Sequence, residues 1–344
     1  MAMKSYKDDI VISNTSSIRG WGALCAALVI GVTAGLLTMP VLADHGDKPI
    51  QINAGSPGWD HSFPFIAEKM GFWKKYGLKV NFLYGSFSRN RQMMSIGDYD
   101  AGYTQISDIM RYIEAGLPIK IVASTTYGAA TLVGAPQIKS VSGLKGNTIA
   151  VTSLRNVQYL VLVHHILPRF GLSRKNVKLL RIRAPEVAAL VTLNQVQAAF
   201  PFEPYGTDAV GKGATMLLDW DQIMDKKILN EEMFRNSLSM TDRLRVKHPD
   251  LAKKVVWAHL DALAVLRKDP EQATEILASY AKRIDKKLTR AAYDKMGLAY
   301  SKIPVSWIAQ LGEWMLKDKF IKRRITASEV TDYSFQKGHP AADK

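Results

Sequence analysis

The chain has 344 residues, of which 47% are hydrophobic, and Gly and Pro contribute 24 and 14 residues. This composition is that of a globular protein with one large or two medium domains, and it excludes a disordered or collagen-like polymer. Lys and Arg number 46 against 31 Asp and Glu, a net charge of +15, which suits nucleic acid, an anionic membrane surface or small anions as partner.

Residues 21–43 form an uncharged apolar run behind a short head that carries Lys4, Lys7 and Arg19. This is the pattern of a secretory signal peptide. The small and medium-sized side chains just before Asp44 predict cleavage after Ala43. The alternative is a retained membrane anchor, because about 20 apolar residues can span a bilayer.

Cleavage would leave a mature chain without cysteine, because Cys25 is the only one in the sequence. A chain without cysteine has no disulfide, no Cys nucleophile and no thiolate metal site. The leader holds three basic and two acidic residues, so the mature net charge is +14. Export also argues against a nucleic acid as partner, despite the positive charge.

The first part of the mature chain alternates apolar, strand-like runs with helical periods, which is typical of an α/β domain with a largely parallel sheet. Strands are predicted at residues 50–54, 78–84, 99–103 and 119–124, and helices at residues 62–75 and 109–115. Ser107 or Asp108 would cap the second helix, and Gly116 would end it.

The same alternation repeats after Pro136. Strands are predicted at residues 147–152, 177–183, 197–202 and 214–219, with helices at 156–170 and from Pro185 and Glu203 onward. From about Lys226 the strand signals disappear and amphipathic helices follow, one of them opened by Asp269 and Pro270. The sequence therefore predicts two doubly wound α/β halves and a C-terminal helical layer.

Four segments resemble, in order and spacing, segments of periplasmic ABC-transporter substrate-binding proteins. They are residues 71–80 (Gly-Phe-Trp-Lys-Lys-Tyr-Gly-Leu-Lys-Val), 96–103 (Ile-Gly-Asp-Tyr-Asp-Ala-Gly-Tyr), 144–151 (Leu-Lys-Gly-Asn-Thr-Ile-Ala-Val) and 202–205 (Phe-Glu-Pro-Tyr). The series is similar to the nitrate/sulfonate/taurine group, which also includes binders of thiamine-pyrimidine precursors. Residues 195–199 depart from the pattern, because a turn Gly and an Asp of the family are missing there.

The resemblance implies a two-lobed periplasmic binding protein type II fold with a discontinuous first lobe. The first lobe would comprise residues 44–135 and 236–344, and the second lobe residues 136–235. The resemblance also implies a solute receptor that delivers its ligand to an inner-membrane ABC permease. For such a receptor we expect a periplasmic monomer with no catalytic residue, metal or cofactor.

The ligand site is predicted at the carboxyl ends of the strands, where helix N-termini offer free backbone N–H groups. Loops at residues 55–61, 85–88, 104–107 and 152–156 carry small hydroxyl side chains, and Arg155 adds a guanidinium that suits an anion. Helix capping is the alternative role for each Ser and Thr. The candidate ligand-binding residues are Ser56, Trp59, His61, Ser86, Phe87, Thr104, Gln105, Tyr127, Thr152, Ser153, Arg155, Asn156, Glu203 and Tyr205.

Aromatic residues of these loops could close over an organic body, although core packing is the alternative for each of them. Trp59 is the strongest aromatic candidate, because a Gly-rich loop has little core of its own to fill. Glu203 could accept a hydrogen bond from the ligand, or it could cap the helix that follows it.

Three motif-like patterns in the sequence do not support a catalytic role. Residues 206–213 have phosphate-loop spacing, but Gly213 replaces the Ser or Thr that would hold magnesium, and the stretch lies in a predicted helix. Ser142 and Lys145 spell Ser-x-x-Lys in a turn rather than in a helix. His164 and His165 are adjacent, so they would lie on different helix faces, one buried and one exposed.

A basic cluster follows a predicted helix near the C-terminus, formed by Lys317, Lys319, Lys322, Arg323 and Arg324. These residues would complement the helix dipole and keep the face solvated, or they would dock on an acidic transporter surface or anionic lipid. The sequence thus predicts an exported, non-catalytic receptor for a small organic anion of the sulfonate, nitrate or carboxylate type. The alternatives are a pyrimidine-precursor binder and an enzyme on the same fold that acts on a pyrimidine-like ring.

Overall fold

The computed structural model describes residues 48–55, 59–85, 87–223, 233–280, 285–298 and 301–342. The predicted signal peptide, residues 1–43, lies outside this part of the chain. Among the described residues, the structure contains no helix with the length and apolar character that a membrane span requires.

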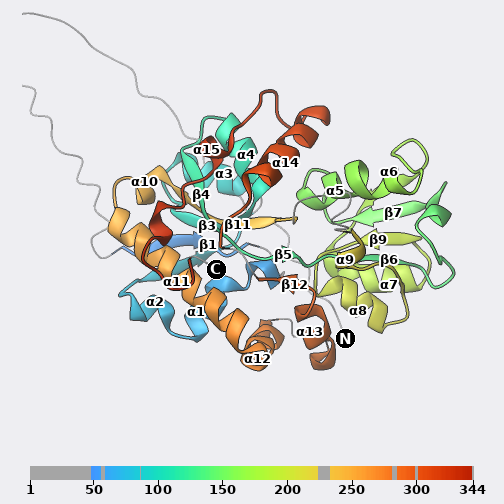
Figure 1. Cartoon of the computed structure of the whole chain (residues 1–344), viewed down its shortest axis with the longest axis horizontal. Coiled ribbons are helices and arrows are strands. Elements are labelled where there is room, and N and C mark those ends of the chain that lie inside the picture. The colour runs from blue at the N-terminus through green and yellow to red at the C-terminus, as the bar shows by residue number, and fades with distance from the viewer. Residues whose placement is uncertain are drawn as a thin grey trace, which may run out of the picture. The chain divides into compact units, whose positions relative to one another are not determined.

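The first of two five-stranded sheets has the strand order β2-β1-β3-β11-β4. Strand β1 pairs in parallel with β2 and β3, whereas β11 runs antiparallel between β3 and β4 (Figure 1). The strands are β1 (Ile50–Asn53), β2 (Val80–Leu83), β3 (Ala101–Gln105), β4 (Ile119–Ser124) and β11 (Asn236–Thr241).

The second sheet has the order β10-β6-β9-β7-β8 and the same plan. Strand β7 is parallel to β8 and β9, and β6 is antiparallel to both β9 and β10. The strands are β6 (Leu132–Gly134), β7 (Thr148–Val151), β8 (Lys178–Arg181), β9 (Ala198–Phe200) and β10 (Thr215–Leu218). The prediction of two α/β halves is confirmed, and each sheet includes one antiparallel strand that the chain contributes just after it leaves the other sheet.

Helices connect and cover the strands. Those of the first part are α1 (Phe63–Lys69), α2 (Phe72–Lys75), α3 (Phe87–Ser95) and α4 (Ile106–Glu114). Those of the middle part are α5 (Val157–Val161), a π-helical segment (Leu162–Ile166), α6 (Leu167–Arg169), α7 (Val187–Thr192), α8 (Tyr205–Gly211) and α9 (Trp220–Ile223). Those of the C-terminal part are α10 (Asp242–Arg245), α11 (Pro249–Lys268), α12 (Pro270–Tyr280), α13 (Lys286–Tyr293), α14 (Val305–Lys317) and α15 (Ala327–Val330).

Two apolar cores lie on the two faces of the first sheet. Ala101 and Tyr103 of β3 pack into the core formed with α1 and α11, while Ile109 of α4 belongs to the core on the other face. Alternate residues of a strand point to opposite faces, and β4 accordingly supplies Ile121 to one core and Val122 to the other. The same buried positions of α4 recur every three or four residues, as expected of a helix with one apolar stripe.

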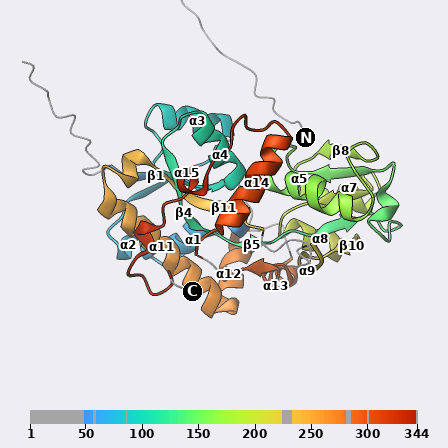
Figure 2. The ribbon, with the colours of Figure 1, turned by 45° about the horizontal axis from the view of Figure 1, so that its top comes forward.

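Helix α14 packs against helices that cover both sheets. It packs against α4, beside the first sheet, and against α5, beside the second (Figure 2). Trp307, Leu311 and Met315 lie four residues apart on one buried face of α14, and they share a continuous core with Ile109 and Leu160. The predicted C-terminal helical layer is confirmed, and one of its helices bridges both halves.

Several predictions differ from the structure. The predicted helix at 62–75 is split at Gly71, whose left-handed backbone (φ 71°) separates α1 from α2. Helix α4 begins at Ile106 rather than at residue 109, and neither Ser107 nor Asp108 is its N-cap. The strand signals do not end at Lys226, because β11 is a central strand of the first sheet.

Strand β11 escaped detection because of its composition. Its side chains alternate between small polar residues and Leu or Met, and every one of its six residues is buried. Ser237 and Ser239 satisfy their hydroxyl groups by donating to the carbonyl oxygens of Thr104 and Gly102 at 3.2 and 3.1 Å. Small polar residues can thus line a buried strand when the neighbouring strand supplies acceptors.

Candidate ligand-binding site

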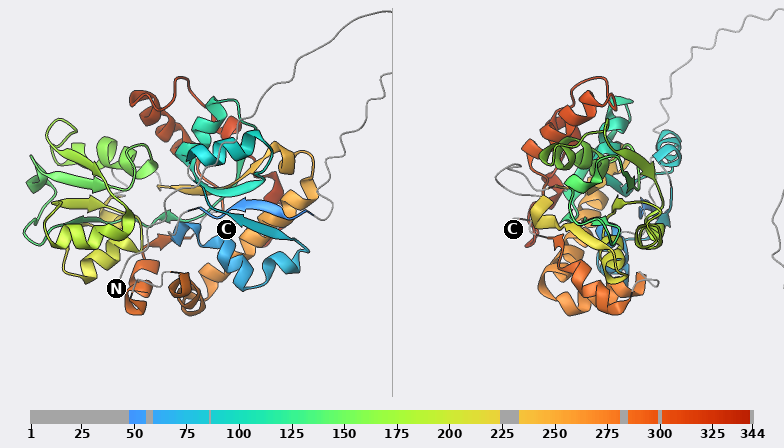
Figure 3. Two further views of the ribbon diagram at one scale, coloured as in Figure 1. Left: turned by 180° about the vertical axis from the view of Figure 1, so that it is seen from behind. Right: turned by 90° about the vertical axis from the view of Figure 1, so that its right-hand side faces the viewer.

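The chain connects the two sheets so that their strand ends face each other. Strand β4 leaves the first sheet at Ser124, and β6 enters the second sheet at Leu132. Because β6 is antiparallel to β9, the carboxyl end of β9 lies beside the entry of β6; likewise, Gln105 at the carboxyl end of β3 pairs with Asn236 at the entry of β11. The short β5 (Tyr127–Gly128) and β12 (Met296–Gly297) pair between the two sheets (Figure 3).

Trp59 and His61 follow the carboxyl end of β1 in a short 3-10 helix. The indole of Trp59 is 2% exposed and packs into the core beside α1, which is the packing role that the sequence left open. Its Nε1, however, has no hydrogen-bond partner among the described residues. A buried N–H group without a partner costs about 1–3 kcal/mol, so this donor is suited to a ligand acceptor.

Gly55 fixes the approach of this loop to β3. Its φ is +76°, and its N–H donates to Asn53 Oδ1 at 2.7 Å. A Cβ at this position would lie 2.7 Å from the ring of His61 and 2.9 Å from the carbonyl oxygen of Tyr103. Only glycine therefore allows His61 to lie against the end of β3.

Thr104 and Gln105 belong to strand β3 rather than to a loop. Thr104 lies within hydrogen-bond distance of the hydroxyl of buried Tyr99, at 3.0 Å, which gives it a structural partner. Gln105 is the N-cap of α4, and its Oε1 is buried without a partner among the described residues. Of these two predicted residues, the structure favours Gln105 as a ligand contact.

Asn236 lies directly opposite Gln105 in the ladder of β3 and β11, so their side chains share one face of the sheet. Its side chain is fully buried, and neither Nδ2 nor Oδ1 has a partner in the described part of the chain. The hydroxyl of buried Ser107, in the first turn of α4, is in the same situation. Buried polar atoms are nearly always paired, so this group at the strand ends marks a candidate binding site.

Arg235 adds a positive charge to this group. The residue is 3% exposed, its carbonyl oxygen accepts from the N–H of Ile106 at 3.0 Å, and its guanidinium lies over the ring of Phe202 at 4.6 Å. A buried guanidinium is favourable for an anion, and the backbone of Arg235 meets the first turn of α4. Arg235 and Asn236 are not among the residues predicted from the sequence, because no strand is predicted after residue 226. The available signal was a cation next to a run of small residues.

The loop after β7 in the second sheet is used mainly for local structure. Asn156 Oδ1 accepts from the N–H of Tyr159 at 2.9 Å, and Ser153 Oγ accepts from the N–H of Arg155 at 3.2 Å. Asn156 also donates to Gln158 Oε1, at 3.1 Å, and Thr152 is half-buried beside them. The capping alternative therefore describes Asn156, and the turn role describes Ser153.

Arg155 is exposed, and its guanidinium lies 5.2 Å from the ring centre of Phe320. Its charge also reaches Asp108 in the first turn of α4. Burial raises the pKa of Asp108, whereas the charges of Arg111, Arg155 and His61 act in the opposite direction.

Glu203 has its oxygens occupied within the protein. Oε1 accepts from the hydroxyl of Thr131 at 2.6 Å and lies 3.7 Å from Lys295 Nζ, while Oε2 accepts from the N–H of Thr207 at 3.0 Å. Its carboxylate is fully buried. These contacts are those of the capping alternative for helix α8.

Tyr127 and Tyr205 lie at the connections between the sheets. The ring of Tyr205 meets that of Phe202 edge-on at 5.3 Å, next to the guanidinium of Arg235. The ring of Tyr127 packs on Phe234 at 5.5 Å. Three other candidates cannot be placed, because Ser56, Ser86 and the side chain of Phe87 lie outside what the structure describes.

His164 and His165 both have structural partners, so the prediction that one is exposed is wrong. His164 Nε2 lies 3.1 Å from Asp318 Oδ1, and His165 Nε2 lies 2.8 Å from the carbonyl oxygen of Ile223. The π-helical segment places the two side chains toward different neighbouring elements. Within the described residues, no group of three or more His, Cys, Asp or Glu side chains could hold a metal ion.

A sequence comparison decides the family. Residues 59–273, more than half of the chain, match the family model described as NMT1/THI5 like. This chain belongs to the NMT1/THI5-like family. The family resemblance predicted from the four sequence segments is thereby confirmed. No curated protein sequence matches this family member significantly.

Solved structures show the fold of this NMT1/THI5-like chain. The ligand-binding component of an ABC-type import system from Staphylococcus aureus, solved with zinc bound, has a TM-score of 0.73 and 14% identity and covers 85% of this chain and 99% of its own. The periplasmic aliphatic sulphonate-binding protein SsuA from Escherichia coli has a TM-score of 0.68 and 16% identity, and the match covers 83% of this chain and 92% of SsuA. A mutant of DszB in complex with biphenyl-2-sulfinic acid has a TM-score of 0.63 and 13% identity, and the match covers 83% of this chain and 97% of DszB. The fold is therefore the periplasmic binding protein fold, as predicted.

Proposed function

We propose that this protein is the extracytoplasmic solute-binding component of an ABC importer. It holds a small organic anion between the strand ends of its two sheets and delivers it to an inner-membrane permease. The structural neighbours named as an ABC import component and as a periplasmic sulphonate binder support this proposal. The proposal includes export, with cleavage after Ala43, and a monomeric, non-catalytic mature protein.

The observation that carries the proposal is the group of buried polar side chains where β3, β11 and α4 meet. Gln105, Ser107 and Asn236 supply donors and acceptors without partners in the described structure, and Arg235 supplies a buried positive charge. The first turn of α4 adds a partial positive charge. An oxyanion would be held there chiefly by Arg235 and by neutral donors, and Arg155 would contribute from the other half.

The lobes in this proposal are residues 44–135 with 236–344, and residues 136–235. The return to the first lobe at residue 236 is supported by β11, which joins the first sheet after all strands of the second. Strand β6 belongs to the second sheet, so it favours a first boundary before Leu132 rather than after residue 135. A ligand that contacts loops of both lobes favours the arrangement in which it makes more contacts, and that arrangement is what the permease would recognise.

The test begins with native mass spectrometry of protein purified without denaturation, which identifies a bound small molecule. Calorimetry with sulfonate, nitrate and carboxylate candidates then gives affinities for the wild type, for Arg235→Gln and for a control, Arg181→Gln, whose side chain is exposed on β8. We expect Arg235→Gln to weaken binding by about 1.5–3 kcal/mol, as for a lost hydrogen bond to a charged group, and the control to bind normally.

Absence of any anionic ligand, or unchanged affinity in Arg235→Gln, would contradict the proposal. Analysis of the small molecules after incubation with the protein distinguishes a receptor from an enzyme on this fold. Stoichiometric binding with the small molecule recovered unchanged supports the receptor, and accumulation of a product supports the enzyme.

A further inference from the structure

The segment between α14 and α15 is a basic loop with a fixed backbone. We call residues 318–326 the seam loop. Ile321 and Ile325 anchor it in the core, where they are 2% and 5% exposed. The N–H of Lys322 donates to Glu114 of α4, and Thr326 closes a capping box with Glu329. A surface that is ordered before binding loses little conformational entropy on association.

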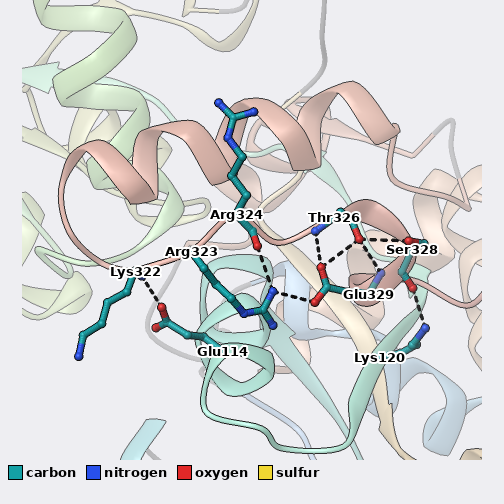
Figure 4. A network of polar contacts seen from close by, with 8 residues as sticks. All are labelled: Glu114, Lys120, Lys322, Arg323, Arg324, Thr326, Ser328 and Glu329. Carbon is teal, nitrogen blue, oxygen red and sulfur yellow. Dashed lines mark hydrogen bonds and ion pairs between the residues drawn. The ribbon is translucent and has the colours of Figure 1, made fainter.

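The network around the seam loop leaves its cationic groups on the outside. Figure 4 shows the side chains of Lys322 and Arg324 extending away from the network, whereas Arg323 turns toward Glu329, 2.8 Å from its Oε1. Lys319, held in a left-handed conformation (φ 57°), is also exposed. Arg324, 79% exposed, has one surface ion pair with Glu313, and such pairs contribute about 0–1 kcal/mol.

Helix-dipole compensation does not account for these charges. The dipole of α14 acts within its last turn, which ends at Lys317. Lys322 and Arg324 lie beyond that turn, on a backbone that runs on toward α15. Their positions are therefore available for recognition of a partner.

The seam loop also contacts both halves of the molecule. The side chain of Asp318 is fully buried, and its Oδ1 lies 3.0 Å from Arg174 Nη2 and 3.1 Å from His164 Nε2, two residues of the part that covers the second sheet. The ring of Phe320 lies 5.8 Å from that of Tyr159. On the other side, Glu114 belongs to a helix that covers the first sheet. A partner bound to this loop would sense any change in how the two halves are arranged.

We propose that the seam loop is a docking surface for an acidic extracytoplasmic face of a membrane-protein partner, the permease of the proposed import system. This inference rests on the proposed function. Ile321 and Ile325 are buried, and the half-buried ring of Phe320 packs beside Tyr159, so the loop presents no fully exposed apolar side chain for insertion into a lipid bilayer. A fixed set of cations instead fits a fixed set of carboxylates, which gives orientation as well as attraction.

The test compares two double variants of the full mature protein with the same change in net charge. Lys322→Glu with Arg324→Glu reverses the loop, and Lys145→Glu with Lys178→Glu reverses two exposed lysines elsewhere. Co-sedimentation is measured with membranes of the source organism that expose their extracytoplasmic face, before and after trypsin treatment. Protein-free vesicles of phosphatidylglycerol and phosphatidylcholine provide the lipid arm.

We expect the loop variant to bind untreated membranes about tenfold or more weakly than the wild type, because like charges then face each other. The control should bind normally, and trypsin should abolish wild-type binding. Equal binding by the loop variant, or wild-type binding to protein-free vesicles as strong as to membranes, would overturn the inference. The calorimetric affinity for the ligand should be the same in the loop variant and in the wild type. A wild type that binds no ligand would refute the proposed function, whereas the membrane-binding result tests the docking surface separately.

Discussion

His259 of α11 allows a quantitative prediction about stability and pH. Its side chain is fully buried, with Nε2 2.8 Å from the carbonyl oxygen of Ser124 and Nδ1 3.2 Å from the hydroxyl of Tyr103. Its ring also stacks on Phe63, with ring centres 4.6 Å apart. Burial lowers the pKa of His259 to about 3, although the Ser124 carbonyl acts in the opposite direction. The neutral ring is therefore the folded form at neutral pH.

The sign of the effect follows from proton binding. An unfolded histidine takes up a proton near pH 6.5, whereas folded His259 resists it until about pH 3. The folded state thus binds fewer protons between these values, and the free energy of unfolding falls as the pH falls through this window. Between pH 7.5 and 4.5, His259 should lower the free energy of unfolding by about 2.7 kcal/mol. This value corresponds to the roughly two pH units between the unfolded pKa of about 6.5 and pH 4.5, at about 1.36 kcal/mol per unit.

The assay is urea unfolding at pH 7.5 and at pH 4.5, for the wild type, His259→Gln and a control, His248→Gln. Glutamine can retain a donor to Ser124 and an acceptor for Tyr103 but takes up no proton. We expect the loss of stability between the two pH values to be about 2.7 kcal/mol smaller in His259→Gln than in the wild type and the control. Equal losses in all three proteins would refute the reasoning, whatever their stabilities at pH 7.5.

Two further substitutions test the buried carboxylate of Glu203 and the turn at Gly55. Glu203→Ala should lower the free energy of unfolding by about 3–5 kcal/mol, because it removes the carboxylate beside Lys295, and a loss below about 1 kcal/mol in urea unfolding would contradict that role. Gly55→Ala should cost about 1–3 kcal/mol more than Gly116→Ala. Both glycines have a left-handed φ, but only at Gly55 would the new Cβ meet His61, so equal losses would rule out the close approach.

The sequence predicted the repeated α/β pattern because most strands are apolar runs bounded by glycine and proline. The predicted helix boundary was wrong where a single backbone conformation determines it, as at Gly71 between α1 and α2. Strand β11 was not predicted, because the hydroxyl groups of Ser237 and Ser239 find their acceptors only on the neighbouring β3. Pairing between segments more than 130 residues apart leaves no local signal.

The prediction of a ligand site at the strand ends remains a prediction, and the sequence did not indicate all the residues that the structure brings together there. Hydroxyl and amide side chains at strand ends have two uses, and the sequence cannot separate them. Asn156 caps a helix, whereas Gln105, also an amide at a strand end, keeps its Oε1 without a partner in the described chain. Asn236 and Arg235 became visible only once β11 was placed opposite Gln105.

The position of β11 between β3 and β4 has a consequence for the order of folding. Strands β3 and β4 have no direct ladder between them, so the first sheet remains divided until the chain has supplied residues 236–241. All strands of the second sheet lie in one continuous stretch, from Leu132 to Leu218. Because closing long loops costs more entropy than closing short ones, we expect the second sheet to form first and the N-terminal strands to wait for the late return of the chain.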